Sequence, residues 1–377
     1  MPKRIFQLAL LLLVFALLPT GSRAAAPSAD RGPQKTVVLV PINDHFQEFV
    51  RTVQRKQPEK PNQFELYDTL FRAALLFDAL GAYGVRYEPS SHKSDFFKRL
   101  AREDSVYLIP PTEVFETGKG SAQSLSLLLI GVLEAAGIQT ALLEVKRHPL
   151  VMFDTRIHKR YAGVLSRNLM AYSIRNNRVW MALEPTALGE PFHEAWEKTY
   201  GKLRGKPLDV LPVVEVFRDN KDLKHRFAEN LDTESVRNLL TQDQHYFERE
   251  EHHAKLEKVT ALMEQDRIQN INDVNRGMAL LNAGNYDQAI SLFQKTVDQG
   301  GDLGEALFLI AKAFGEQQKY DKMKRSGLKM LLLNPRDPRG YKILGLAYYY
   351  TGNLPAGEQF LTRARFLEHN LITWDKL

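Results

Sequence analysis

Residues 120–145, GSAQSLSLLLIGVLEAAGIQTALLEV, decide the fold of the first half of the chain. Apolar residues recur at helical spacing from Ser124 to Ala136 and fill both sides of the helix, so this stretch predicts a helix buried nearly all round. Gly137 is a residue type that commonly follows the end of a helix. Thr140–Val145 is typical of a β-strand. A buried helix followed by strands predicts an α+β domain.

Further elements are expected on both sides of this core. Apolar residues at helical spacing predict a helix over Phe64–Tyr83. Asn176-Asn177 suits a two-residue hairpin turn, because Asn tolerates positive φ. Thr36–Val40 has the β-branched residues of a strand. The strands expected to form an antiparallel meander with Thr140–Val145 are Leu150–Asp154, Leu169–Arg175 and Arg178–Leu183.

Short motifs surround the buried helix in a particular order. They are Pro111, Glu116-Thr117 and Gly120 before the helix, His148 after the first strand, and Glu184-Pro185-Thr186 after Trp180. This order resembles the core of transglutaminase-like domains, strongly over Tyr83–Leu188 and more loosely over 35–210. The resemblance implies a papain-type fold in which a cysteine at the helix start gives its proton to a histidine that an acidic residue orients.

The nucleophile of such a site is missing, because the chain contains no cysteine. The resemblance places Ala122 at the cysteine position and Ser124 at an acidic position of the same turn. It places His148 and Glu184 as the base and its orienting carboxylate. A methyl group cannot attack a carbonyl, so we expect a pseudoenzyme whose relic cleft holds a peptide-like or glycan ligand without turning it over.

A serine-based alternative remains open. Ser121 neighbours the lost cysteine, and Ser121, His148 and Glu184 could form a triad in a hydrolase or acyltransferase that uses this hydroxyl or a bound water. The simpler interpretation is that Ser121 caps the helix. A residue one position away from the nucleophile is turned by about 100° around the helix axis. We therefore favour the capping role.

Two other groups of polar residues are candidate binding sites. A basic stretch after the Leu150–Asp154 strand is either plain surface or an anion-binding patch beside the relic cleft, and consists of Arg156, His158, Lys159, Arg160 and Arg167. His245, Glu248 and His252 could share one helix face as metal ligands, but a solvated charged helix explains them as well. We expect no metal and no cofactor.

The last hundred residues repeat with a period of 34. The repeated positions are Gly277, Ala311 and Gly345; Ala279, Ala313 and Ala347; Tyr286, Tyr320 and Leu354; and Gly284, Gln318 and Gly352, with Ala289 in the first unit. This pattern resembles the tetratricopeptide repeat and implies three helix pairs over 271–370 in an all-α domain. We expect the alanines at 279, 313 and 347 to lie where helices cross closely.

The segments before and between these domains are predicted to be a signal peptide, a linker and charged connecting helices. Lys3 and Arg4 precede the apolar run Leu8–Leu18 and small residues up to Ala26, which predicts a signal peptide over 1–26, followed by a linker over 27–35. The run is short for a membrane span, and lipidation at the cleavage site would need a cysteine. The domain related to transglutaminases should cover 36–210, and charged connecting helices should cover 211–270.

Together these patterns predict an exported, periplasmic protein with no membrane span after cleavage. Removal of Lys3, Arg4 and Arg23 lowers the formal charge from +6 to +3, which is no footprint of nucleic-acid binding. The expected function is non-catalytic binding or scaffolding in the cell envelope, with a protein or peptide partner on the repeats. Besides the hydrolase, the alternative is a structural subunit of an envelope machine.

Overall fold

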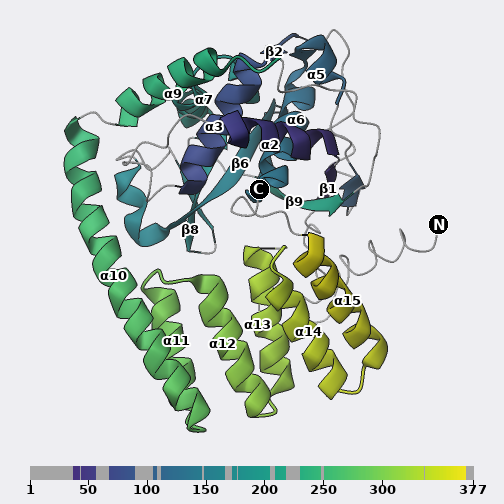
Figure 1. Ribbon diagram of the computed structural model, residues 1–377, viewed down its shortest axis with the longest axis vertical. Helices are drawn as coiled ribbons and strands as arrows, with labels where there is room; N and C mark the ends of the chain where they lie inside the picture. The colour runs from purple at the N-terminus through teal and green to yellow at the C-terminus, as the bar shows by residue number, and fades with distance from the viewer. Residues whose placement is uncertain are drawn as a thin grey trace, which may run out of the picture. The chain divides into compact units, whose positions relative to one another are not determined.

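The structure is a computed structural model, and the chain in it forms two compact units, within residues 33–261 and 262–371 (Figure 1). The residues that it describes are 37–42, 44–56, 68–89, 105–107, 112–146, 148–165, 172–175, 177–203, 209–217, 230–247, 250–334 and 336–370. The predicted signal peptide and linker lie outside these ranges. Within them, no helix has both the length and the apolar character needed to cross a membrane.

A seven-stranded sheet forms the centre of the first unit, in the order β3-β1-β9-β5-β6-β8-β7. The strands are β1 (Val37–Ile42), β3 (Ser105–Tyr107), β5 (Thr140–Val145), β6 (His148–His158), β7 (Ser173–Arg175), β8 (Arg178–Leu183) and β9 (Asp209–Phe217). A separate parallel pair joins β2 (Arg86–Tyr87) to β4 (Lys119–Gly120). The bounds of β5 and β8 agree with those expected from the sequence.

The sheet departs from the predicted antiparallel arrangement in three ways. It is mixed, because β1 pairs in parallel with both β3 and β9. β8 lies between β6 and β7, so the last strands are not in simple sequential order. Finally, β9 pairs with β1 and β5. The domain boundary predicted at residue 210 was therefore wrong, because it cuts a strand whose partners come from distant parts of the chain.

Helices pack around this sheet. They are α2 (Asp44–Lys56), α3 (Asp68–Ala82), α5 (Val114–Thr117), α6 (Ala122–Ala135), α7 (Phe192–Leu203) and α9 (Thr233–Phe247), with 3₁₀ turns η2 (Lys159–Val164) and η3 (Pro185–Ala187). The predicted buried helix is α6, which contacts β1, β5 and β6 and is buried from Leu125 to Ala135. Gly137 follows it with a φ of 77°. A Cβ on Gly131 would come within 2.9 Å of the Phe46 ring, so this glycine lets α2 cross α6 closely.

The segment predicted to connect the two domains belongs largely to the first unit. α9 packs against α3 and α7. The chain then enters α10 (Glu250–Asn282), a single helix of 33 residues that contains the division between the two units at 261/262. The predicted boundary at 270/271 was therefore too late, because the first helix of the repeats continues the helix that precedes it.

The second unit is a stack of helix pairs whose bounds repeat with the period of the sequence. After α10 come α11 (Tyr286–Asp298), α12 (Leu303–Glu316), α13 (Tyr320–Leu333), α14 (Pro338–Tyr350) and α15 (Leu354–Asn370). The first helices of the pairs end at Asn282, Glu316 and Tyr350, and the second helices begin at Tyr286, Tyr320 and Leu354, each 34 residues apart. The turn residues Gly284, Gln318 and Gly352 all have positive φ, at 78°, 57° and 82°.

Small residues lie where the helices of this unit approach each other. Ala289, Ala311, Ala313 and Ala347 are fully buried. A Cβ on Gly277 would lie 2.5 Å from the Phe293 ring. The expectation for Ala279 was wrong, because this residue is exposed. Ala279 belongs to the first pair, and no helix of a preceding pair covers it.

Replacement of Ala313 by Leu should overpack the stack and lower its free energy of unfolding by about 1–3 kcal/mol. Ala279→Leu is the matched control, because it is the same change at the equivalent but exposed position. Hydrogen exchange should show lost protection in α11–α15 for Ala313→Leu alone, with the first unit unchanged. Equal effects of the two substitutions would contradict the packing described.

Candidate functional site

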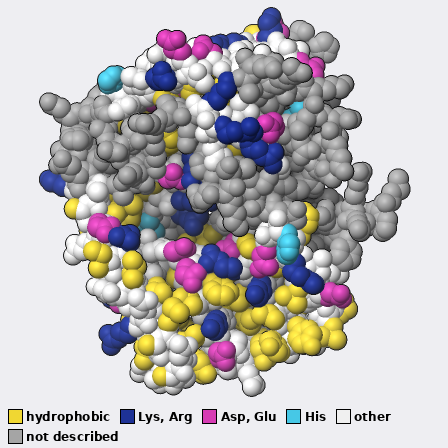
Figure 2. Space-filling model, in the orientation of Figure 1, with side chains coloured by type: hydrophobic (Ala, Val, Ile, Leu, Met, Phe, Trp, Pro, Cys, Tyr) yellow, Lys and Arg dark blue, Asp and Glu magenta, His cyan; other side chains and the backbone are white. Residues whose placement is uncertain are grey.

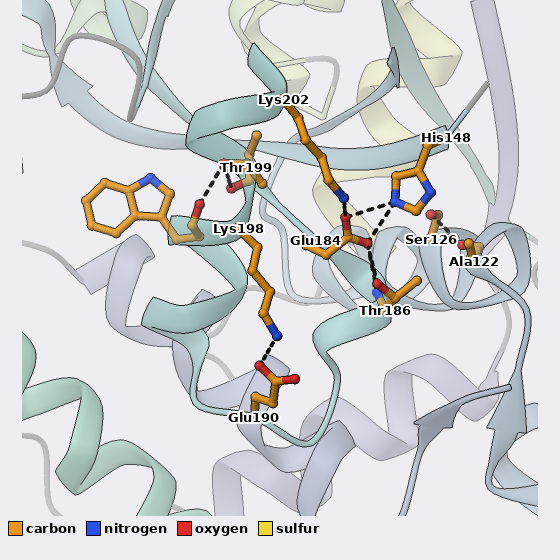
Figure 3. A network of polar contacts seen from close by, with 11 residues as sticks. Ala122, Ser126, His148, Glu184, Thr186, Glu190, Lys198, Thr199 and Lys202 are labelled. Carbon is orange, nitrogen blue, oxygen red and sulfur yellow. Dashed lines mark hydrogen bonds and ion pairs between the residues drawn. The ribbon is translucent and has the colours of Figure 1, made fainter. Parts of the chain in front are cut away.

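Two neighbouring strands bring His148 and Glu184 together. His148 begins β6, and Glu184 directly follows β8. In this antiparallel pair Val151 lies opposite Leu183, so the same register puts His148 and Glu184 on one face of the sheet. The Nε2 atom of His148 lies 2.9 Å from Oε1 and 2.8 Å from Oε2 of Glu184 (Figure 3). The predicted pairing of these two side chains is confirmed.

Further donors surround the carboxylate of Glu184. Thr186, in η3, donates from its backbone N–H at 3.1 Å and from its hydroxyl at 2.7 Å, both to Oε1. Lys202, from the last turn of α7, forms an ion pair with Oε2. The Glu184 side chain is only 2% exposed, whereas those of His148 and Lys202 are 31% and 39% exposed. The carboxylate is therefore buried beneath two partly exposed basic groups.

These partners keep Glu184 ionised. Burial alone would raise the pKa of the Glu184 carboxyl, because the charged form loses its hydration. The hydrogen bonds from His148, Lys202 and Thr186, together with the charge of His148, outweigh burial and lower the pKa to about 2. At neutral pH the site thus contains a fixed negative charge that orients the imidazole.

The start of α6 supplies the position where a nucleophile would be expected. Ala122 is the first residue of α6, and Ser121 is its N-cap. The Ser121 hydroxyl accepts a hydrogen bond from the Ser124 backbone N–H at 3.2 Å and also contacts the Gln123 and Ser124 side chains. The predicted capping role of Ser121 is confirmed. The serine triad loses support, because this hydroxyl is already engaged at the helix end.

α6 packs against both β6 and η3, the elements that carry or follow the two polar side chains. Figure 3 shows the edge of the His148 ring away from Glu184 turned to the side where Ala122 and Ser126 are drawn. The Ser126 hydroxyl donates to the Ala122 carbonyl at 2.7 Å. With Nε2 held by the carboxylate, Nδ1 is the imidazole atom left to exchange a proton with a neighbouring group. The Ala122 side chain has no proton to exchange with this imidazole.

The basic stretch lies far from this site. β6 continues through a bulge to His158, so Arg156 and His158 are strand residues, and Lys159 and Arg160 belong to η2. Arg156 and His148 are separated by eight strand residues, roughly 25 Å. The Arg156 guanidinium donates to the Gly137 carbonyl at 3.2 Å. The possible position of the basic stretch beside the cleft was therefore wrong. The strand extends to His158, beyond the predicted Leu150–Asp154, and so carries these residues away from His148. Arg167 lies outside the described residues.

The possible metal site gains no support. Within the described ranges, no group of three or more His, Asp or Glu side chains could hold a metal ion. His245 lies on α9, Glu248 is outside the described residues, and nothing is described of the side chain of His252.

Lys202 was missed by the sequence interpretation. It lies 18 residues after Glu184, on a helix whose basic residues look like ordinary surface charges. Only the packing of α7 against β8 brings its ammonium group to the carboxylate. A weak signal existed, since Lys202 and Thr199 share one helix face and Thr199 is buried.

Comparison with protein-family models and with curated proteins finds no match to the chain.

Replacement of Glu184 by Gln should change how stability depends on acid. Because folding lowers the pKa of Glu184, its stabilising contribution is present above the ordinary value of 4.5 and is lost as the pH falls toward about 2. Glu184→Gln should cost about 1–3 kcal/mol at neutral pH, and its stability should fall less steeply with acid. Urea unfolding at several pH values measures this. Glu197→Gln, an exposed change on α7, is the control. If the free energy of unfolding of Glu184→Gln depended on pH as that of the wild type does, the ionised network would be contradicted.

Proposed function

We propose that this chain is an exported, non-catalytic binding protein, with a domain similar to transglutaminases that has lost its nucleophile and tetratricopeptide-like repeats that receive a protein partner. The observation that carries the proposal is the complete network around Glu184 beside a position 122 that holds alanine. A base and its orienting carboxylate are present, but the alanine at position 122 cannot form a covalent intermediate. Such a cleft can still select a ligand by shape and hydrogen bonding.

The periplasm is the proposed location, on the basis of the N-terminal sequence. The hydrolase that uses Ser121 is a weaker candidate, because the Ser121 hydroxyl caps α6. A scaffold role in a larger envelope assembly is compatible with the same surfaces and differs only in how many partners bind.

The repeats offer a surface suited to a partner. Glu305 and Arg339, at the same position of successive repeats, form an ion pair, so equivalent residues of α12 and α14 are neighbours. At equivalent or neighbouring positions along the same helix face, the exposed side chains are Ile271 and Met278 on α10, Lys312 on α12, and Lys342 and Tyr349 on α14. We call these five residues the repeat face. Figure 2 shows hydrophobic side chains over the repeats with Lys and Arg among them.

The charges of the repeat face indicate what kind of segment it would bind. Arg339 is neutralised by Glu305 and Asp337. Lys312 and Lys342 form no ion pair with any residue that the structure describes. The other three residues of the repeat face, Ile271, Met278 and Tyr349, are exposed hydrophobic side chains. We therefore propose a partner segment with acidic residues next to apolar ones, since opposite charges favour encounter and register.

The catalytic part of this proposal is tested by Ala122→Cys. The native chain should give only background in transamidation and thiol-protease assays and should be indifferent to iodoacetamide. Ala122→Cys should react with an activated ester in a burst that iodoacetamide abolishes, and Ala122→Cys/Glu184→Gln should react more slowly, because the imidazole is no longer held. Turnover by the native chain would overturn the non-catalytic assignment.

The repeat face is tested by reversing its free charges. Lys312→Glu/Lys342→Glu should lower the recovery of partner from envelope extract by about tenfold or more, since each repulsive contact costs about 1 kcal/mol or more. Lys329→Glu, an exposed change on α13 away from this face, should recover the partner as the wild type does. Equal recovery by all three proteins would show that the partner binds elsewhere.

A further inference from the structure

The N-terminus of α7 is capped by carboxylates from two other helices. The Phe192 backbone N–H donates to Oδ1 of Asp78 on α3 at 3.1 Å, and the His193 backbone N–H donates to Oδ1 of Asp243 on α9 at 2.8 Å. The first N–H groups of a helix have no partner within it. Asp78 and Asp243 are 0% and 1% exposed. These two caps therefore join α3, α7 and α9 in the interior of the first unit.

The two carboxyl groups also act on each other. Their Oδ2 atoms are buried, and neither receives a hydrogen bond from a donor in the described part of the chain. Burial, and then the charge and hydrogen bonding of Asp243, raise the pKa of Asp78 well above its usual range, against the lowering effect of the Phe192 N–H. Two adjacent buried carboxylates cannot both be ionised without a large cost. One proton between them would supply the donor that both Oδ2 atoms lack.

The surroundings hold few other charges. The Nδ1 atom of His193 lies 2.7 Å from Oδ1 of Asp243, and its ring stacks on Tyr246 at 4.5 Å. Of the remaining titratable groups on the packed helices, Tyr200 is a neutral phenol whose pKa is raised by burial. The others pair away from the two carboxyls or lie on the exposed side: Asp68 with Arg72 on α3; Lys198 with Glu190, Lys202 with Glu184, and Glu194 and Glu197 on α7; and Glu234, Arg237 and His245 on α9.

We propose that Asp78 and Asp243 share a single proton, and that this proton holds α9 against α3 and α7, so that its loss in alkaline medium releases α9. The shared proton would thus act as a pH-sensitive latch, that is, a contact that holds α9 in place at low pH and releases it at high pH. α9 immediately precedes α10, the helix in which the chain passes from the first unit to the second. The latch does not depend on the proposed function, because it uses neither Glu184 nor the repeat face.

The direction of the pH effect follows from the shift. Because folding raises the pKa of Asp78, the stabilisation is complete below the ordinary pKa of an aspartic acid and is lost as the pH rises through the raised value. Trp196 reports the same event. It is fully buried, stacks on Phe247 at 5.9 Å and lies edge-on to Tyr246, both near the end of α9.

The test is hydrogen exchange of the full-length chain at pH values from roughly 5 to roughly 9, a range that covers raised pKa values of buried carboxyls. After correction for the intrinsic exchange rate, protection of residues 233–247 should fall about tenfold per pH unit as the pH approaches the raised pKa, the slope for one proton, and should level off above it. Tryptophan emission should shift to the red over the same range. Asp78→Asn should remove both effects, because its amide donates to Asp243 at every pH.

Asp243→Asn is the second variant, since its amide can donate to Asp78 in the same way. Asp232→Asn, an exposed change just before α9, is the control, and its α9 protection should depend on pH as in the wild type. Should one Asn variant fail to fold, the other decides. Protection of α9 that is independent of pH in the wild type would overturn the latch. So would an unchanged pH dependence in the Asn variants, or failure of both to fold, since an amide should replace the shared proton.

Discussion

The carboxylate of Glu184 lies out of reach of solvent, and a buried charge is stable only where donors replace the water it has lost. Those donors come from β6, η3 and α7, so the ion pair with Lys202 and the bonds from His148 and Thr186 fix three elements relative to β8. Removing one partner would leave the buried negative charge of Glu184 without full compensation in a low-dielectric interior, which would destabilise the folded state. The site is therefore part of what holds the first unit together.

The repeat unit is held by a different constraint. Each helix pair must place small residues where helices cross, and it does so at positions 34 apart, with a left-handed turn between the two helices. Such a unit contacts mainly its neighbours, so its stability is a sum of local terms. The exposed helix faces are consequently free to vary in charge without loss of fold, and Lys312 and Lys342 lie on such a face.

Sequence reasoning succeeded where the deciding interactions are local. The period of 34 predicted three helix pairs in the last hundred residues, and the residue types of Thr140–Val145 and Arg178–Leu183 predicted the bounds of β5 and β8. It failed where partners are distant in the chain: β9 is joined to the sheet by β1 and β5, and α9 is joined to α3 and α7. For the same reason Lys202, Asp78 and Asp243 carried no signal, because a lone Lys or Asp on a helix looks like surface until tertiary packing buries it. Only the pair His148 and Glu184 was foreseen, through motif order.

The central claim is that His148, held by Glu184, faces position 122, where we propose that a nucleophile has been lost. The most direct measurement is the pKa of a thiol placed there, read from thiolate absorbance in Ala122→Cys and compared with Gln123→Cys, one residue further around the same helix end. A thiol paired with an imidazole should have a pKa below about 7, against about 8.5 for a free cysteine. The account predicts this depression at position 122, smaller at 123, and lost from Ala122→Cys when His148 is replaced by Ala. Equal pKa values at the two positions, or no response to the loss of His148, would contradict it.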